Sequence, residues 1–289
     1  MLNLISPDTD RKDEKRFYDT VYNNMENAHT ELVSPLQAAK LWHKYDQPEL
    51  RVTRKAIGNL REKQVLLLGN GASVKELAFL LDDPAYILYS DLSAYGSRAI
   101  EAISDLRGFR NRIVFCAVDA QNLFFADSSF DVVYGYAMVH HLPDIPLFLK
   151  EVTRVLRPGG KAIFMDDAYS PIWHKSKQTW LRPLMRYSHR TTGISPEDYR
   201  FSMAGGFKES VLAEAITTAG AVPWFLRSSL FTYVFFRGTE KLLPRRISDL
   251  ARQLFGPPLS VLDSVLGKLA FFQRNQIRLI WGLRKPASG

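Results

Sequence analysis

The sequence predicts an α/β protein with a mostly parallel β-sheet that is covered by helices on both faces. Three observations support this prediction: short apolar runs alternate with helical patterns, a glycine turn follows the first run, and acidic residues follow the next two. Strands buried on both faces appear as continuous apolar runs. In such sheets ligands bind beyond the carboxyl ends of the strands, so the residues after each strand are the candidates for a functional site.

The composition is that of an ordinary globular protein. The chain has 289 residues, of which 46% are hydrophobic, so a sizeable core is expected. No apolar run reaches the length of a membrane span, and the polar N-terminus predicts no signal peptide. Cys116 is the single cysteine, which excludes an intramolecular disulfide and disfavours a thiol zinc cluster. These features predict a cytoplasmic protein.

Residues 1–60 are predicted to form an N-terminal helical cap. Tyr18 and Tyr22 lie on one face of an amphipathic pattern. A second helix is expected to begin at Ser34 and Pro35, since proline suits the first turn of a helix. Two interpretations stay open for this region, namely a lid over the site or simple packing against the edge of the sheet.

The central part of the chain alternates between strands and helices. Strands are expected at 64–69, 86–90, 113–118, 130–135 and 161–165. Helices are expected at 73–82, 93–106, 145–156 and 208–219. This order predicts a parallel sheet with its helices distributed over both faces.

Informative residues follow four of these strands. Gly69-Asn70-Gly71 follows the first strand, Asp91 ends the second, Asp119 follows the third, and His140-His141 comes shortly after the fourth. Glycine permits a tight turn and a close approach of the main chain to a ligand, and an acid about twenty residues later suits the two hydroxyls of a ribose. Any one of the acids could be an ordinary helix cap. Together, at neighbouring strand ends, they indicate a nucleotide-like ligand.

Residues 64–166 resemble the class I S-adenosylmethionine-dependent methyltransferases, and are most similar to the branch that contains the ubiquinone and menaquinone methyltransferases. The matching segments are VLLLGNGAS, YSDLS, VDAQNLFFADSSFDVVYGYAMVHHLPD and FLKEVTRVLRPGGKAIFMDD. The resemblance implies a Rossmann-like, seven-stranded sheet that ends in an antiparallel hairpin. The segments at 221–227 and 231–237 fit that hairpin.

The resemblance also implies S-adenosyl-L-methionine as the cofactor. The glycine loop would approach its methionine part, Asp91 its ribose, and Asp119 with Ala120 its adenine, while Gly135 and Tyr136 would contribute main chain near the sulfonium. The implied cofactor-binding residues are Gly69, Asn70, Gly71, Ser73, Asp91, Leu92, Asp119, Ala120, Gly135 and Tyr136.

Four positions depart from the pattern of this family. Ser73 stands where the loop usually has its third glycine, and Asn70 stands where cysteine or serine is frequent. In the ubiquinone O-methyltransferases, carboxylates near the HHL segment help to hold a divalent metal. Here those positions resemble Ala137 and His140, so the resemblance does not support a metal requirement.

Two histidines are the candidate catalytic residues. His140 and His141 are expected beside the sulfonium, and histidine titrates near neutral pH, so either could remove a proton from the acceptor. Packing of the helix or contact with the cofactor is the alternative role for each. Asp166 and Asp167, which follow the fifth strand, are alternative acceptor-binding residues or bases, and loop capping explains them equally well.

The predicted domain organisation places the methyltransferase domain at 61–239, with a lid-like insertion at 169–200 and a basic helical tail at 240–289. The tail has nine Lys or Arg against three acids, and an apolar stripe that includes Leu262 and Leu266. Such a helix suits an anionic membrane surface. Packing on the core or on a second subunit remains the alternative, and the oligomeric state cannot be derived from the sequence.

The functional prediction is methyl transfer to a small-molecule or lipid-like acceptor, at an undetermined O, N or C atom. A nucleic-acid methyltransferase is the first alternative, encouraged by the net charge of +8. It is disfavoured because the segment after the fourth strand lacks an Asn/Asp-Pro-Pro-Tyr/Phe motif and because no RNA-binding motif is evident. A non-catalytic partner protein that retains the fold is the second alternative.

Overall fold

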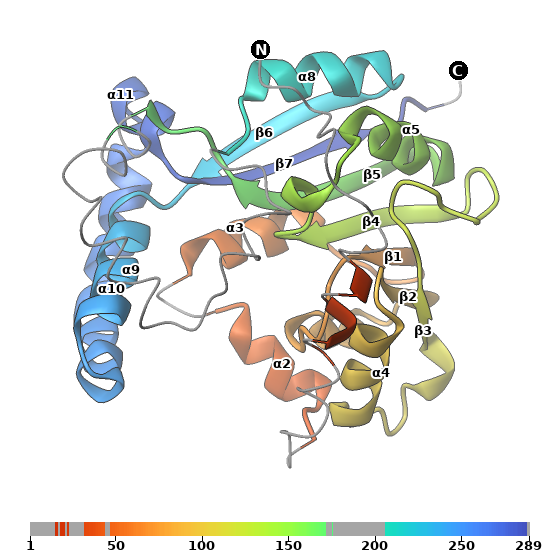
Figure 1. The fold of residues 1–289 in the computed structure, drawn as a ribbon, viewed down its shortest axis with the longest axis horizontal. Coiled ribbons are helices and arrows are strands. Elements are labelled where there is room, and N and C mark those ends of the chain that lie inside the picture. The colour runs from red at the N-terminus through yellow and green to blue at the C-terminus, as the bar shows by residue number, and fades with distance from the viewer. Residues whose placement is uncertain are drawn as a thin grey trace.

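A computed structural model describes residues 15–16, 18–20, 22, 32–43, 47–171, 175 and 206–287 of the chain. These residues form a seven-stranded sheet in the order β3-β2-β1-β4-β5-β7-β6 (Figure 1). The strands are β1 (Gln64–Leu68), β2 (Tyr86–Asp91), β3 (Ile113–Ala117), β4 (Phe130–Tyr136), β5 (Leu156–Asp167), β6 (Val222–Ser228) and β7 (Arg278–Arg284). The predicted α/β fold with a mostly parallel sheet is thereby confirmed.

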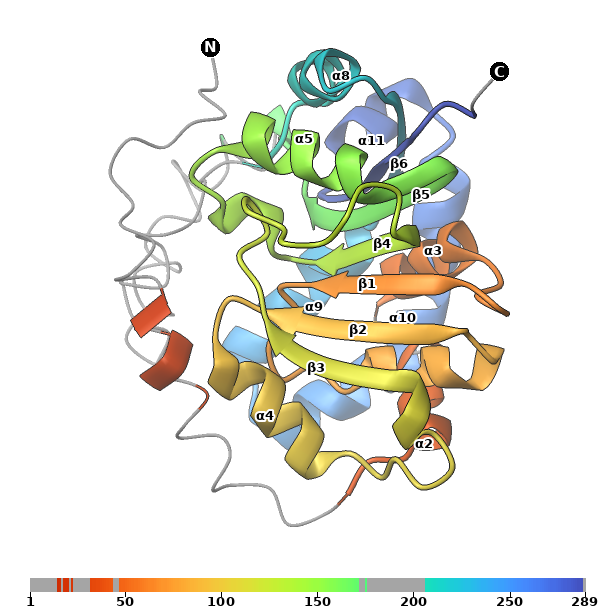
Figure 2. The same ribbon diagram turned by 90° about the vertical axis from the view of Figure 1, so that its right-hand side faces the viewer.

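Helices cover both faces of the sheet (Figure 2). They are α2 (Pro35–Leu41), α3 (Pro48–Ile57), α4 (Ala94–Ile103), α5 (Ile145–Val155), α8 (Glu209–Thr218), α9 (Phe231–Leu242), α10 (Arg245–Leu266) and α11 (Ala270–Asn275), with short 3₁₀ helices η1 (Lys75–Asp82), η2 (Arg110–Arg112) and η3 (Val139–His141). Apolar side chains of α5 and α8 pack on one face of the sheet. Those of α2, α3, η1 and α4 pack on the other.

The first four strands and β5 run parallel, so their carboxyl ends share one edge of the sheet. β1 lies between β2 and β4 and pairs in parallel with both. Strand order therefore reverses at β1, and the crevice beyond its end is where ligands bind in open α/β sheets. β7 pairs antiparallel with β5 and with β6.

Helix α2 begins where the Ser34-Pro35 pattern predicts. The Ser34 side chain accepts a hydrogen bond from the Gln37 N–H, and the Gln37 side chain accepts one from the Ser34 N–H, which forms a capping box. Ala38 and Trp42 are buried in the core beneath it. Helices α2 and α3 thus pack on a face of the sheet, rather than against its edge as the packing interpretation expects.

The expected hairpin partner at 231–237 is wrong, because that segment forms the first part of α9. Its aromatic and β-branched residues favour a strand locally, but tertiary contacts decide otherwise. The Asp263 carboxylate accepts hydrogen bonds from the main-chain N–H groups of Leu230, Phe231 and Thr232, at 2.7–2.9 Å. This side chain satisfies the free N–H groups at the start of the helix.

The strand that pairs with β6 is β7, which lies within the tail expected to be helical. Leu279, Ile280, Trp281 and Leu283 are completely buried there. The expected domain boundary at residue 239 therefore divides the sheet, and 240–289 is not a helical tail throughout. The helices α9, α10 and α11 are instead an insertion between β6 and β7. The expected lid at 169–200 falls almost entirely outside the described residues.

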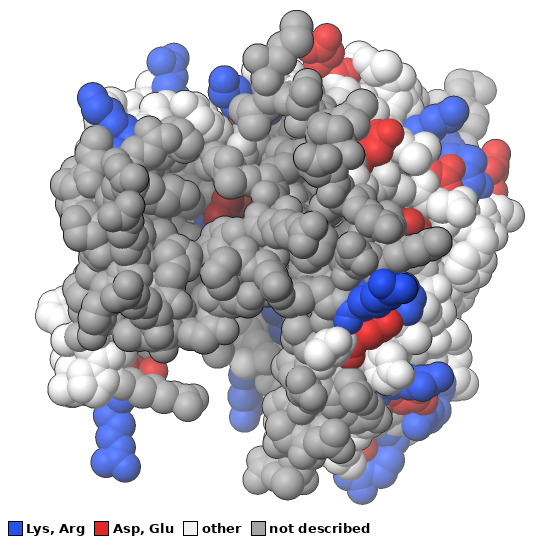
Figure 3. All heavy atoms as spheres, in the orientation of Figure 1, with Lys and Arg blue, Asp and Glu red and all other residues white. Residues whose placement is uncertain are grey.

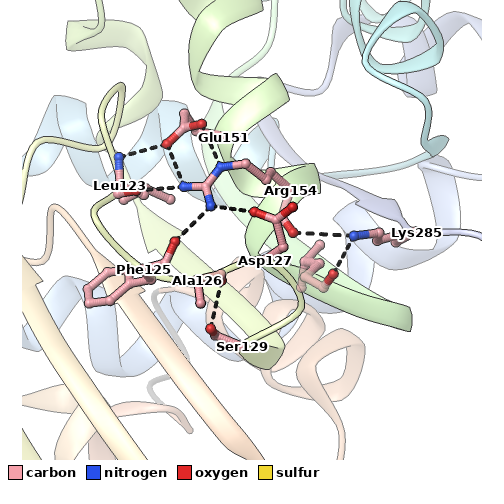
Figure 4. A network of polar contacts seen from close by, with 9 residues as sticks. Leu123, Phe125, Ala126, Asp127, Ser129, Glu151, Arg154 and Lys285 are labelled. Carbon is pink, nitrogen blue, oxygen red and sulfur yellow. Dashed lines mark hydrogen bonds and ion pairs between the residues drawn. The ribbon is translucent and has the colours of Figure 1, made fainter.

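A polar network fixes the loop that connects β3 to β4 (Figure 4). Arg154 of α5 donates to the main-chain oxygens of Leu123 and Phe125, at 2.6 and 2.7 Å, and to the Asp127 carboxylate at 2.8 Å. It also forms two bonds to Glu151, which lower the pKa of that carboxyl. The planar guanidinium suits such a set of converging acceptors. The network holds the segment that follows β3 in position beside the sheet.

Replacing Trp281 by alanine is expected to lower the free energy of unfolding by about 3–5 kcal/mol, because it removes a fully buried aromatic side chain from the sheet. The matched control is Phe271→Ala in the same part of the chain, whose side chain is 61% exposed. This control is expected to change stability by no more than about 0.5 kcal/mol. Urea denaturation of both variants measures the difference, and equal losses would contradict the placement of β7 in the core.

Candidate functional site

A pocket of about 260 Å³ lies at the carboxyl ends of β1, β2 and β4. Its walls come from the loops that follow these strands and β3, and from the N-terminal helical turn that contains Tyr18 and Tyr22. The volume is slightly below the usual range of ligand pockets, roughly 300–1,000 Å³. The two tyrosines occupy part of the space above the strand ends.

The glycine turn after β1 has the backbone conformation that the sequence predicts. Gly69 and Gly71 have φ angles of 59° and 53°, in the left-handed region. A Cβ atom at Gly69 would lie 2.8 Å from Cβ of Met138, and one at Gly71 would collide with the Tyr22 hydroxyl. Glycine is therefore required at both positions, and the bare main chain forms the wall of the pocket.

Asp91, at the end of β2, links two of these loops. Its Oδ2 accepts a hydrogen bond from the Gly71 N–H at 2.8 Å, and its Oδ1 accepts one from the Ser93 N–H at 2.9 Å. The side chain is only 5% exposed, yet it lines the pocket. A carboxylate only accepts hydrogen bonds, which is the property that the hydroxyls of a ribose require of a partner.

Asn70 provides a test of whether the pocket suits a polar ligand. Its side chain is buried, and neither its Nδ2 nor its Oδ1 has a hydrogen-bond partner among the described residues. Leaving such a group unsatisfied costs about 1–3 kcal/mol. Because Asn70 also lines the pocket, a ligand with an amino and a carboxylate group would satisfy it. The residues present therefore fit the amino-acid end of S-adenosylmethionine.

The N-terminal helical turn covers part of the pocket. Tyr18 and Tyr22 line it, and the Ser93 hydroxyl donates to Asp19 at 2.5 Å, which attaches this turn to the start of α4. Burial raises the pKa of Tyr22 far above its ordinary value, with a further contribution from the Asp91 charge. The phenol of Tyr22 therefore stays protonated beside the carboxylate.

The remaining predicted cofactor residues divide into two groups. Leu92, Ala120 and Tyr136 line the pocket together with Gly69, Asn70, Gly71 and Asp91. Asp119, Ser73 and Gly135 are not among its lining residues. The Asp119 carboxylate accepts from the Gln121 N–H at 2.9 Å, which shapes the loop beside Ala120. The Ser73 hydroxyl donates to Glu76 at 2.7 Å.

The two histidines have different surroundings. His141 lines the pocket, and its ring nitrogens lie 3.4 and 3.5 Å from the Tyr18 hydroxyl. His140 does not line the pocket, but its Nδ1 lies 2.7 Å from Oδ1 of Asp166. The Trp281 Nε1–H donates to the other oxygen of Asp166 at 3.2 Å. Since a carboxylate only accepts, Nδ1 of His140 carries the proton and Nε2 of the neutral ring can accept one.

Asp166 and Asp167 point to different partners because successive side chains of a strand alternate between faces. Asp167 pairs with Arg278 of β7, and the Arg278 guanidinium also lies 3.8 Å from the buried Glu49 carboxylate. Close by, burial raises the pKa of Tyr136 to about 12, and the Lys75 ammonium lies 3.7 Å from the centre of its ring. Among the described residues, no three His, Cys, Asp or Glu side chains gather as a metal site would need.

Sequence reasoning missed two features of the site. Met138 lines the pocket and contacts the positions of both Gly69 and Gly135, but an apolar residue in a loop gives no signal in the sequence. The pairing of His140 with Asp166 was also missed, although both residues had been singled out. Their spacing of 26 residues along the chain does not reveal the contact, which depends on the neighbouring positions of β4 and β5.

Comparison with known proteins gives a consistent result. A family described as a methyltransferase domain matches residues 66–164. The chain is 37% identical to a phthiotriol/phenolphthiotriol dimycocerosates methyltransferase of Mycobacterium leprae, over 37% of this chain and 39% of the relative. It is 27% identical to a 27-O-demethylrifamycin SV methyltransferase of Amycolatopsis mediterranei, over 50% of this chain and 57% of that relative. The chain thus spans roughly two to three fifths of these relatives.

A solved structure of a phosphoethanolamine N-methyltransferase 2 of Haemonchus contortus, in complex with S-adenosyl-L-methionine, shares the fold. It has a TM-score of 0.53 and 15% identity, over 83% of this chain and 52% of the other. This chain combines that fold with a glycine turn after β1 and an acid at the end of β2. Both lie within or beside the matched residues 66–164. By these findings residues 66–164 match a methyltransferase domain, and the chain has the fold of S-adenosylmethionine-dependent methyltransferases.

Proposed function

We propose that this protein transfers a methyl group from S-adenosylmethionine to a lipid-like small molecule. The observation that carries the proposal is the pocket at the ends of β1, β2 and β4, where two left-handed glycines, the unsatisfied Asn70 amide and the Asp91 carboxylate converge. The Mycobacterium leprae relative supports the acceptor class, because its name specifies phthiotriol and phenolphthiotriol dimycocerosates.

The cofactor-binding role of these residues follows from their chemistry. Asp91 would accept hydrogen bonds from the ribose hydroxyls, and Asn70 would bind the amino-acid end. Val118 and Ala120 provide an apolar wall that suits an adenine ring, with Asp119 shaping their loop. S-adenosylmethionine supplies a methyl group on a positively charged sulfur. We assign the main chain of Tyr136 and Ala137, two residues that line the pocket, to that part of the cofactor.

We assign the proton-accepting role to His140. Asp166 holds the ring through Nδ1, so Nε2 is available to accept a proton from an acceptor that must lose one. The His140 and His141 ring centres are 4.0 Å apart, so His140 stands directly beside a residue that lines the pocket. Asp166 is a positioning residue, as it fixes the tautomer and the direction of the imidazole. His141 contributes to the pocket wall.

The acceptor class agrees with a peripheral membrane location. We propose the helical part of 240–289, which precedes the buried strand β7, as the contacting segment. No helix in the described parts of the chain has both the length and the apolar character required to cross a membrane. The cytoplasmic location predicted from the single cysteine remains a prediction.

Replacing Asp91 by asparagine is expected to weaken binding of S-adenosylmethionine by roughly 10- to 100-fold. The change keeps the volume but removes the charge, and hydrogen bonds to a charged group contribute about 1.5–3 kcal/mol. Isothermal titration calorimetry measures the affinity. The matched control is Asp105→Asn, which removes a carboxylate paired with the exposed Arg107 and should leave the affinity unchanged. Equal affinity of all three proteins would refute the proposed site.

Replacing His140 by glutamine is expected to lower the rate of methyl transfer by roughly 10²–10⁴-fold, because a positioned base contributes about that factor. Affinity for S-adenosylmethionine should stay unchanged, since His140 lies outside the pocket wall. The assay uses methyl-labelled S-adenosylmethionine with a total lipid extract as the acceptor source.

Two further variants serve as controls for this assignment. His141→Gln is expected to weaken cofactor affinity more than it lowers the rate at saturating cofactor. Asp166→Asn is expected to lower the rate and to change its pH profile, because asparagine can hold the other tautomer of His140. A pH profile identical to that of the unaltered protein would remove Asp166 from the positioning role.

A further inference from the structure

Helix α10 turns its polar face toward the core and its apolar face toward solvent, which is the reverse of an ordinary surface helix. Surface helices normally turn an apolar stripe toward the core and a polar face toward water. In α10 the buried side includes Ser248, Gly256 and Asp263, which are small or polar. Ile247, Leu250, Leu254, Val261 and Val265, here called the outer stripe, are 53–62% exposed instead.

The spacing of the outer stripe shows that it is one continuous surface. Its members recur at intervals of three, four and seven residues, and therefore share one side of the helix. Phe255 and Leu262 adjoin it and are also exposed, as are Leu269 and Phe271 just beyond the helix. A contiguous apolar patch of this extent marks an interaction site on a folded protein.

The inward polar side of α10 is explained by its structural role. Asp263 caps α9 with three main-chain hydrogen bonds, and its Oδ2 also accepts from the Thr232 hydroxyl at 2.5 Å. The helix is thus held in its present rotation by a buried polar contact. Rotating α10 to bury the outer stripe would leave the Asp263 charge without these donors, which is unfavourable.

Cations flank the outer stripe. Arg246 precedes it, and Lys268 and Arg274 follow it, all exposed. In the orientation of Figure 1, Lys and Arg side chains project from the lower edge of the molecule, beneath α10 and α2 (Figure 3). Asp249 is the exposed acid of α10, and it lies outside the stripe. Bulky apolar residues between cations form the pattern of helices that lie on anionic bilayers.

A basic groove adjoins the same helix. It has a volume of about 720 Å³, and its walls include His43, Arg51, Lys55 and Arg61. The one acid in its walls, Asp82, is paired with Arg54 at 2.7 Å. The Arg51 guanidinium donates to the Ser260 hydroxyl at 2.7 Å, so the groove meets α10 at Ser260. Its excess of positive charge suits phosphate headgroups.

We propose that the outer stripe of α10 and the adjoining basic groove dock this protein on an anionic lipid bilayer. The stripe inserts between the headgroups and the groove binds their phosphates. The role of this docking rests on the proposed function, since the protein would take a lipid-like acceptor from the bilayer. A second copy of the chain fits less well, because a twofold antiparallel pair of α10 helices would place Arg246 of one copy near Lys268 of the other.

The test is flotation of the full chain with vesicles that contain phosphatidylglycerol, and with vesicles of phosphatidylcholine alone, in the absence of cofactor. The unaltered protein is expected to float with the anionic vesicles. The triple variant Leu250→Gln, Leu254→Gln, Val261→Gln should lose roughly tenfold or more of this binding, since each residue transfers apolar area to the membrane. The double variant Arg51→Gln, Lys55→Gln should lose about fivefold per charge on anionic vesicles only.

The matched control is the triple variant Leu36→Gln, Val114→Gln, Leu147→Gln, which changes three exposed apolar residues outside α10 and should float like the unaltered protein. Thermal unfolding and calorimetry with S-adenosylmethionine verify that each variant is folded and binds its cofactor. No flotation of the unaltered protein, or equal flotation of the α10 variant, overturns the proposal. The proposal is also overturned if sedimentation shows that the unaltered protein is a dimer and that the α10 variant is a monomer. If the unaltered protein floats with anionic vesicles but does not bind S-adenosylmethionine, only the proposed function is refuted, and the docking proposal stands.

Discussion

One buried carboxylate joins the end of the chain to its functional site. Asp166 receives hydrogen bonds from Trp281 of β7 and from the ring and the main-chain N–H of His140. Because Asp166 is only 1% exposed, each of these donors matters to its stability in the core. The turn that carries the two histidines is therefore positioned by the strand formed last in the sequence. Without β7, the Asp166 carboxylate would lose the Trp281 donor, and β5 would lose its pairing on one edge.

The cofactor pocket also depends on a buried carboxylate, which in this case accepts hydrogen bonds from main-chain amides. Asp91 binds the amides of Gly71 and Ser93, so the turn after β1 and the start of α4 are fixed to the end of β2. Arg154 does the same for the loop that leads from β3 to β4. The walls of the pocket are loops, but each loop is attached to a strand or a helix of the rigid core. Because the loops are already ordered, binding of a ligand costs them little conformational entropy.

The sequence predicted the central sheet well, because its strands are local apolar runs bounded by glycine and acidic residues. Gly69, Gly71 and Asp91 were identified on spacing alone, and the structure brings them together at one pocket. The end of the sheet was not predictable in this way. Residues 231–237 have the composition of a strand but become helical through Asp263, which lies more than 25 residues away in the sequence. The pairing of His140 with Asp166 and the reversed orientation of α10 are likewise tertiary properties, and no local pattern specifies them.

The position of β7 has a consequence for how the protein is made. Among the strands of the described residues, β6 pairs only with β7, and the outer edge of β5 is covered by the same strand. During synthesis β5 and β6 precede β7 by many residues, so a growing chain presents two unpaired strand edges until residues 278–284 leave the ribosome. Unpaired edges invite association with other chains. Translation that stops shortly before residue 278 would thus yield a product with an open sheet, and quality-control proteases should remove it rapidly.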